Sequence, residues 1–163
     1  MSLAFLKSSA GDQTVVIEGI FKAPIARVYR AWTEPEEMMK WFGPSEEALL
    51  AVECDLRIGG RISFEYKTLE NISSIIEGTY QTIDLNHKLV FSWSHIVTRP
   101  DGSQEATPPS KVTVIFEDLG FETKVRLTHE NIVRQAGRDG VTQGWNATFQ
   151  RLQALFDNGA DLI

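Results

Sequence analysis

Two histidines and one arginine are the side chains of this sequence best suited to move a proton or to hold an anion. His95 ends an alternating run that places it on the same strand face as Trp93, and His129 ends a second alternating run. An imidazole titrates near neutral pH, so a histidine that lines a pocket can act as a general acid or base. Arg61 is a candidate to hold a ligand carboxylate near the mouth of such a pocket. For both histidines, the sequence favours the plainer alternative of a hydrogen-bonded position in a wall.

Other catalytic and metal-binding chemistry leaves no pattern in the chain. Cys54 is the only cysteine, so no internal disulfide can form, and no Cys/His/Asp/Glu cluster with ligand spacing accompanies the histidines. No G-x-S-x-G, Walker or G-x-G-x-x-G motif occurs. Gly59 and Gly60 lie between two expected strands, which predicts a turn or bulge rather than a phosphate-binding loop. We therefore expect no metal ion, no cofactor and no set of catalytic residues, and the sequence favours a protein that is not an enzyme.

The composition argues against several kinds of partner. The chain has 163 residues, of which 42% are hydrophobic and 23% charged, and this predicts a single domain over residues 1–163 with its core at about 14–158. The net charge is −6 and no block rich in Lys or Arg occurs, which argues against nucleic acid or an anionic membrane as a partner. No signal-peptide pattern opens the chain, and no apolar stretch approaches the roughly 18 residues of a membrane span. A cytoplasmic location is the expectation, and the lone cysteine suits it.

The first part of the chain predicts one strand and two short helices. Residues 14–21 are rich in β-branched side chains and are expected to form a strand. A helix is expected over 24–32, with Pro24 in its first turn. Thr33 is then expected to cap a second short helix, in a capping box with Glu36.

The rest of the chain changes from a period of two to a helical period. From 48 to 130 apolar residues alternate with polar ones between turn signals. Residues 99–110 contain three prolines and are expected to form an exposed loop. Residues 140–158 carry a broad apolar face at helical spacing and are expected to form the longest helix. Six antiparallel strands are expected between the helices, at 49–56, 61–67, 73–83, 89–96, 111–117 and 123–130.

Eight short motifs in a fixed order carry a resemblance to a known family. They are 21–35, Trp41-Phe42-Gly43-Pro44, Gly59-Gly60-Arg61-Ile62-Ser63-Phe64, Gly78-Thr79-Tyr80, Leu89-Val90-Phe91-Ser92-Trp93, 112–116, Leu127-Thr128-His129-Glu130 and Gly144-Trp145. In this order they resemble the branch of the START-like (SRPBCC) superfamily named after homologues of the activator of the heat-shock-protein-90 ATPase. The resemblance covers about residues 15–156. It implies an α+β helix-grip fold, in which a curved antiparallel sheet of about seven strands, in β-α-α-β6-α order, wraps a long C-terminal helix.

The resemblance also implies a cavity between the sheet and the last helix. In the family's strand order one strand separates His95 from His129, which puts their backbones roughly 9–10 Å apart. Buried tryptophan and tyrosine need a polar partner, so the aromatic residues suit a cavity with mixed walls better than a dry core. We expect the cavity to take an apolar or aromatic small molecule. The expected ligand-binding residues are Trp32, Met38, Trp41, Phe64, Tyr80, Phe91, Trp93, His95, Val114, Phe116, Leu127, His129, Trp145 and Phe149.

Two other functions stay open at this point, because proteins of this superfamily differ in activity. One is an enzyme of the polyketide cyclase or aromatase type that acts on an aromatic substrate, oriented by His95, His129 or Arg61 in the same cavity. The other is an interaction domain like the chaperone ATPase activators, which needs an exposed apolar patch. A homodimer is also open. The same inward-facing residues can form a filled core instead of a cavity, and the sequence does not distinguish the two.

Overall fold

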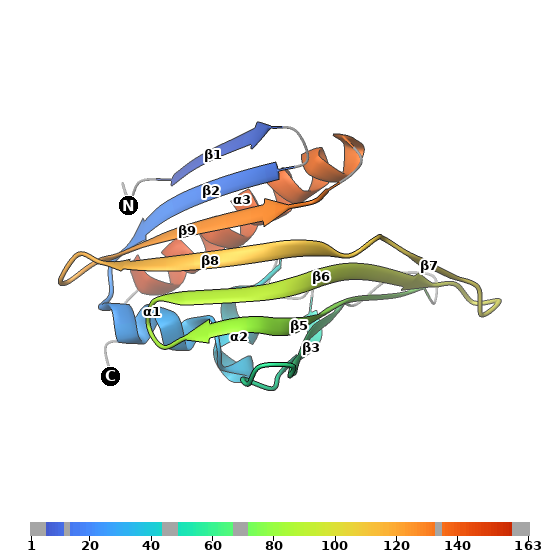
Figure 1. Ribbon diagram of the computed structural model, residues 1–163, viewed down its shortest axis with the longest axis horizontal. Helices are drawn as coiled ribbons and strands as arrows, with labels where there is room; N and C mark the ends of the chain where they lie inside the picture. Colours follow the sequence, from blue (N-terminus) through green and yellow to red (C-terminus); the bar gives the residue numbers. More distant parts are fainter. Residues whose placement is uncertain (1–5, 12–13, 44–48, 67–71, 133–134, 158–163) are drawn as a thin grey trace.

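A curved antiparallel sheet that wraps around one long helix is the architecture of this protein (Figure 1). The computed structural model describes residues 6–11, 14–43, 49–66, 72–132 and 135–157. Their elements, in chain order, are β1 (Leu6–Gly11), β2 (Thr14–Phe21), α1 (Ile25–Ala31), α2 (Pro35–Trp41), β3 (Leu49–Cys54), β4 (Arg61–Tyr66), β5 (Ser73–Asp84), β6 (Lys88–Thr98), β7 (Gln104–Ala106), β8 (Ser110–Asp118), β9 (Thr123–Glu130) and α3 (Gln135–Asp157).

The strands of the sheet follow the order β1-β2-β9-β8-β6-β5-β4-β3, and β7 pairs with β6. In Figure 1 the strands lie in front of α3, while α1 and α2 lie at the lower edge. Alternation decides which side chains face the helix: Val125 and Leu127 of β9 are fully buried, whereas Arg126 between them is exposed. This confirms the helix-grip fold that the motifs predict. It also confirms that one strand, β8, lies between the strands of His95 and His129.

Two strands were not expected from the sequence. β1 extends the sheet beyond β2, and its residues carry no apolar alternation that would have marked them. β7 lies inside the segment expected to be only a loop, where Ala106 pairs with Ile96 and Gln104 with Thr98. The expectation was wrong for these three residues, because β6 continues to Thr98 and offers a free backbone edge, and it was wrong for Ser110, which is half-buried and begins β8. Residues 99–109 are nevertheless all exposed, as expected.

Two helix boundaries differ from the expected ones. Helix α3 begins at Gln135, five residues before the expected start, because Gly140 continues the helix instead of opening it. Thr33 does not cap α2, and Glu34 occupies the cap position without a side-chain hydrogen bond. The Thr33 hydroxyl instead donates to the carbonyl oxygen of Tyr29 at 3.1 Å. The capping-box prediction was wrong because Thr33 directly follows the end of α1, whose free carbonyls are the nearest acceptors.

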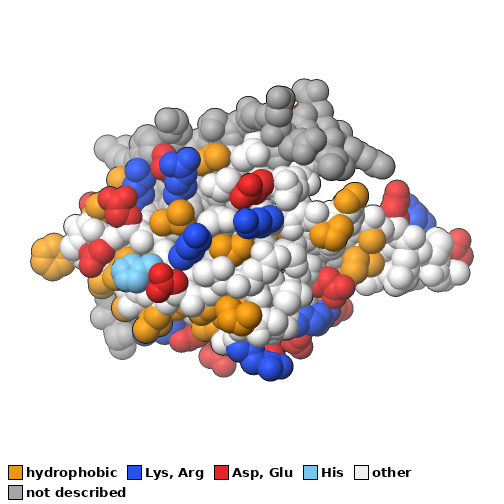
Figure 2. Space-filling model, viewed as in Figure 1, with side chains coloured by type: hydrophobic (Ala, Val, Ile, Leu, Met, Phe, Trp, Pro, Cys, Tyr) orange, Lys and Arg blue, Asp and Glu red, His pale blue; other side chains and the backbone are white. Residues whose placement is uncertain are grey.

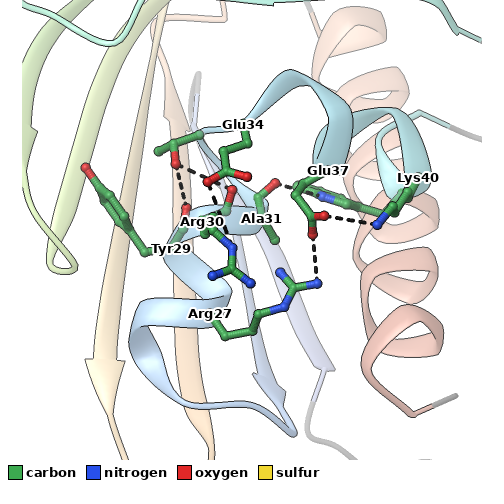
Figure 3. A network of polar contacts seen from close by, with 9 residues as sticks. Arg27, Tyr29, Arg30, Ala31, Glu34, Glu37 and Lys40 are labelled. Carbon is green, nitrogen blue, oxygen red and sulfur yellow. Dashed lines mark hydrogen bonds and ion pairs between the residues drawn. The ribbon is translucent and has the colours of Figure 1, made fainter. Parts of the chain in front are cut away.

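An ionic network joins α1 to α2 (Figure 3). The Glu37 carboxylate lies 2.7 Å from the guanidinium of Arg27 and 3.0 Å from the ammonium of Lys40. The side chains of Arg27 and Glu37 are only 10% and 14% exposed, so water screens this pair little. The two cations hold the pKa of Glu37 below its usual value although burial alone would raise it. The network fixes the angle between two helices of only seven residues each.

Aromatic rings form the centre of the core beneath α1 and α2. Trp32 is 1% exposed, and the centroid of its ring lies 4.7 Å from that of Trp41 and 5.9 Å from that of Phe149. The indole N–H of Trp41 donates to the carbonyl oxygen of Ala31 at 3.0 Å, so this buried polar group is satisfied.

No helix among the described residues is long and apolar enough to cross a membrane. On the face seen in Figure 2, basic and acidic side chains lie interspersed.

Candidate functional site

A pocket of about 640 Å³ lies between the sheet and the first half of α3. The helix contributes one face, on which Gly140 and Gly144 leave room and Trp145 forms the floor beside them. Apart from the chain neighbours and the nearby backbone of the helix itself, no atom of the described residues lies within 4 Å of the position where a Cβ would stand at either glycine. The pocket therefore exists partly because two successive turns of the helix have no side chain on that face. Exposed Gly140 and Gly144 also mark where the pocket reaches the surface.

A chain of hydrogen bonds forms the wall between α3 and the sheet. The Trp145 indole N–H donates to Nδ1 of His129 at 3.2 Å. Nε2 of His129 lies 2.7 Å from the Ser110 hydroxyl, which donates to the carbonyl oxygen of Trp93 at 3.2 Å. Because Nδ1 accepts a hydrogen bond, the ring proton of neutral His129 lies on Nε2 and is donated to Ser110. All three hydrogen bonds are therefore donated in the same direction, from Trp145 to His129 on β9, then to Ser110 on β8 and to Trp93 on β6.

This hydrogen bonding makes His129 a structural residue of the wall. Its side chain is fully buried, and burial lowers its pKa to about 4. In a protonated ring the N–H of Nδ1 would point at the N–H of Trp145. Both burial and this clash of two donors therefore disfavour the charged form of His129. His129 also cannot take a proton from Ser110, because its Nε2 already carries one. This arrangement agrees with the alternative that the sequence favoured for His129, a hydrogen-bonded histidine in the pocket wall.

His95 lies on the same sheet face, two strands away, and differs from His129. It is half-buried and lines the pocket, and its Nε2 lies 2.5 Å from the hydroxyl of Ser74 on β5. Within the described residues, Nδ1 of His95 has no hydrogen-bond partner. Burial lowers the pKa of His95, so the ring is neutral at pH 7. Of the two histidines, His95 is therefore the one with a ring nitrogen left to exchange a proton with a bound molecule.

The end of α2 forms another wall, and α3 holds it in place. The ring of Phe42 stacks on that of Phe64 with centroids 3.9 Å apart, and meets the ring of Trp145 edge-on at 5.7 Å. Arg151 of α3 donates hydrogen bonds to the carbonyl oxygens of Phe42 at 3.0 Å and Lys40 at 2.9 Å. It also reaches the carbonyl oxygen of Gly43 at 3.3 Å. One guanidinium therefore satisfies the free carbonyls at the end of α2 beside the pocket.

The rim of the pocket comes from the segment between β7 and β8. Thr107 is bonded to His95 twice: its amide donates to the His95 carbonyl oxygen and its hydroxyl accepts from the His95 amide, both at 2.9 Å. Glu105 lies on this rim and its carboxylate is 2.8 Å from the guanidinium of Arg99. Pro108 completes the rim next to Thr107. The backbone of His95 is thus held from outside the sheet.

Four of the fourteen expected ligand-binding residues line this pocket. They are Trp93, His95, His129 and Trp145. The other ten are buried in the core under α1 and α2, where rings already fill the space. These ten are Trp32, Met38, Trp41, Phe64, Tyr80, Phe91, Val114, Phe116, Leu127 and Phe149.

Arg61 does not lie at the pocket mouth. Its guanidinium is 2.8 Å from the Glu77 carboxylate and 3.1 Å from that of Glu53, on an exposed part of the sheet. The sequence therefore predicted the position of Arg61 wrongly. Its guanidinium is paired with two carboxylates of the protein itself and is not available to a ligand in the pocket. Within the described residues, no group of three or more His, Cys, Asp or Glu side chains is arranged so that it could hold a metal ion.

Several pocket residues were missed from the sequence. Val97 follows His95 at the next inward position of β6, and Val141 lies one turn before Trp145 on α3, so alternation and helical spacing could have found them. Gly140 was taken as the start of the helix and Gly144 only as part of a family motif, so neither was assigned to the pocket. Other lining residues that were missed are Phe42, Gly43, Tyr66, Ile76, Glu105, Ala106, Thr107, Pro108, Ser110, Asn131, Ile132 and Thr148.

These features define a START-like helix-grip domain with a half-open, mostly apolar pocket under its long helix. Residues 22–157 match the family model described as Activator of Hsp90 ATPase homolog 1-like protein, and the chain belongs to this family. No curated protein matches the chain.

Solved structures of the same fold are similar over nearly the whole chain. A protein from Arthrobacter aurescens is 17% identical, with a TM-score of 0.75 over 93% of this chain and 91% of that one. An uncharacterized protein from Rhizobium leguminosarum is 24% identical, with a TM-score of 0.73 over 96% of this chain and 99% of that one. DynU16, a protein of the dynemicin biosynthetic locus, is 17% identical, with a TM-score of 0.67 over 91% of this chain and 49% of that one. At these identities the likeness establishes the fold and no activity.

Proposed function

We propose that this protein binds a neutral aromatic small molecule in the pocket between the sheet and α3. The observation that carries the proposal is the pocket itself: its volume of about 640 Å³ lies within the range of about 300–1,000 Å³ typical of small-molecule sites. That so much space stays empty beside a core filled with rings supports a use for it.

The lining supports an aromatic ligand. The ring centroids of Trp93 and Trp145 lie 5.3 Å apart with a tilt of 46°, and both residues line the pocket. Ile76, Val97 and Val141 add aliphatic surface around them. A planar ring can contact both indoles with the offset or edge-on geometry that aromatic pairs prefer.

The lining also supports a ligand without net charge. Among the described residues that line the pocket, Glu105 is the one with a charged side chain, and it is exposed and paired with Arg99. His95 and His129 are neutral at pH 7 because burial lowers the pKa of both. A ligand carboxylate would therefore lose its hydration without a cationic partner from these residues.

A pair of helix variants tests the proposal. Gly144→Leu adds a side chain at a glycine that lines the pocket, while Ala154→Leu adds the same side chain at an exposed position of the same helix that does not line it. We expect Gly144→Leu to weaken binding of 2-acetylnaphthalene at least about tenfold in calorimetric titration, and Ala154→Leu to leave it unchanged. Equal affinity in all three proteins, or no binding by the unmodified protein, would overturn the proposal. Native mass spectrometry of freshly purified protein would reveal a natural ligand as an added mass lost on denaturation.

One observation favours a second function, the docking of a partner protein. Phe121 is 94% exposed at the turn between β8 and β9, and Leu85 is 69% exposed at the turn between β5 and β6. Exposed apolar side chains mark an interaction site where they form a contiguous patch. The matching family model is named after an activator of the Hsp90 ATPase. The test is the ATPase rate of purified Hsp90 with the protein and with Phe121→Ser: stimulation that the variant loses supports docking, and an unchanged rate with the unmodified protein refutes it.

A further inference from the structure

Two pairs of serine and histidine, whose histidines both line the pocket, differ in their other hydrogen bonds. In each pair Nε2 of the histidine lies within hydrogen-bond distance of a serine hydroxyl: His129 with Ser110 at 2.7 Å, and His95 with Ser74 at 2.5 Å. The two pairs differ in the partner of Nδ1 of the histidine, and in whether the serine hydroxyl makes a second hydrogen bond. These decide which of the two histidines can respond to a bound molecule.

The first pair has a fixed direction. Trp145 can only donate, so Nδ1 of His129 must accept and Nε2 must carry the proton. The Ser110 hydroxyl donates its own proton to the carbonyl oxygen of Trp93, which accepts and cannot reverse the bond. Both ends of this chain are groups with a single role. His129 therefore has one tautomer and no hydrogen-bonding capacity left for a ligand.

The second pair has no such fixed end. The Ser74 hydroxyl can donate to Nε2 of His95 or accept from it, because in the described structure it has no other partner. When Ser74 donates, the proton of the neutral ring lies on Nδ1, which then is a donor. When Ser74 accepts, the proton lies on Nε2, and Nδ1 is an acceptor. Nδ1 itself has no partner among the described residues, and His95 lines the pocket.

We infer that Nδ1 of His95 is a hydrogen-bonding group that the pocket offers to its ligand beside the polar side chains of Tyr66 and Asn131, and that Ser74 lets it serve either a donor or an acceptor. This rests on the proposed function, since it concerns the same pocket. It specifies the ligand class further: an aromatic molecule that carries a phenolic hydroxyl or a ketone, rather than a bare hydrocarbon. Either group finds a partner at the same position, with only a change of tautomer.

Three probes of one ring system test this inference by affinity. They are 2-naphthol, which can donate, 2-acetylnaphthalene, which only accepts, and naphthalene, which does neither. A neutral hydrogen bond contributes roughly 0.5–1.5 kcal/mol, so we expect both polar probes to bind about 3- to 10-fold more tightly than naphthalene. In His95→Phe this preference should disappear while naphthalene still binds. A preference that survives in His95→Phe, or its absence in the unmodified protein, would refute the inference and leave the pocket proposal standing.

The tautomers give a second readout that needs no variant. The chain has three histidines, so the ring nitrogens of His87, His95 and His129 can be assigned and followed by ¹⁵N NMR. At pH 7.5, 2-naphthol should move the His95 signals toward the Nε2–H tautomer and 2-acetylnaphthalene toward the Nδ1–H tautomer. His129 should stay in the Nε2–H tautomer with both, and exposed His87 should not respond. Shifts of His95 in the same direction, or none on binding, would overturn the inference; failure of all three probes to bind would overturn it together with the proposed function.

Discussion

Trp145 of α3 and His129 of β9 are joined by a hydrogen bond of 3.2 Å from the indole nitrogen to Nδ1. It is the contact through which the long helix and the sheet share a buried polar group in the pocket wall. Because an indole N–H only donates, this one bond determines the tautomer of His129 and the direction of the bonds that follow it. Three predictions concern this wall and the elements that hold it.

The free energy of unfolding should fall as the pH is lowered from 7 to 5. The pKa of His129 is about 4 in the folded protein, against an ordinary value of about 6.5 when the chain is unfolded. The unfolded chain therefore binds a proton in this range while the folded protein does not, so acid favours unfolding. The linkage predicts a loss of about 2 kcal/mol between pH 7 and pH 5 from this residue.

Urea unfolding at both pH values measures this loss, and two variants separate its sources. His129→Gln should be less stable at pH 7 and show a smaller decrease toward pH 5. His95→Gln should retain most of the decrease, because His95 is only half-buried and burial lowers its pKa less completely. An undiminished pH dependence in His129→Gln would show that another group titrates.

Replacement of Arg151 should destabilise the protein and disturb the pocket. Arg151→Met keeps an aliphatic stem like that of arginine but removes the guanidinium and its hydrogen bonds to the carbonyl oxygens of Lys40, Phe42 and Gly43. Hydrogen bonds from a charged donor contribute about 1.5–3 kcal/mol, and we expect a loss of about 2 kcal/mol in chemical unfolding.

Arg126→Met is the matched control for this experiment. The Arg126 side chain is 55% exposed and its carboxylate partner lies 3.9 Å away, so its removal should change the stability by less than about 0.5 kcal/mol. If both variants were equally stable, the bonds from Arg151 to the end of α2 would have no measurable role.

Two glycine substitutions should act in opposite directions. A Cβ at Gly78 would overlap the backbone oxygen of Ser92 on the neighbouring strand, which cannot move without breaking the sheet. Gly78→Ala should therefore cost about 3 kcal/mol or more, or prevent folding. A Cβ at Gly144 meets nothing within 4 Å, and Gly144→Ala should raise the stability by up to about 1 kcal/mol. Thermal unfolding of both variants checks this, and a destabilised Gly144→Ala would contradict the open space described there.

The sequence predicts the sheet well because each central strand buries one face. In β9 every second residue from Thr123 to His129 is buried, and this pattern is visible in the residue types. The strand β7 could not be predicted, because Gln104, Glu105 and Ala106 are exposed and pair only through their backbones. Where burial does not select the side chains, the sequence carries no record of the pairing.

The candidate site could be predicted only in part. Apolar periodicity shows that Trp32 and Trp93 both point inward, but not that α1 and α2 fill the space around Trp32 and leave that around Trp93 open. That difference depends on how two short helices pack, and on Arg151 reaching the end of α2. The inward direction of His95 was predictable, whereas its pairing with Ser74 depends on the register between β5 and β6.

The two glycines on the pocket face of α3 place local stability and cavity size in opposition. Each glycine inside a helix costs about 1 kcal/mol relative to alanine, and nothing nearby would hinder a side chain at either position. A larger residue at Gly140 or Gly144 would thus strengthen the helix and shrink the pocket in one step. The width of the pocket can change by single substitutions that the fold tolerates, so relatives with the same sheet and helix can differ in the size of molecule that they admit.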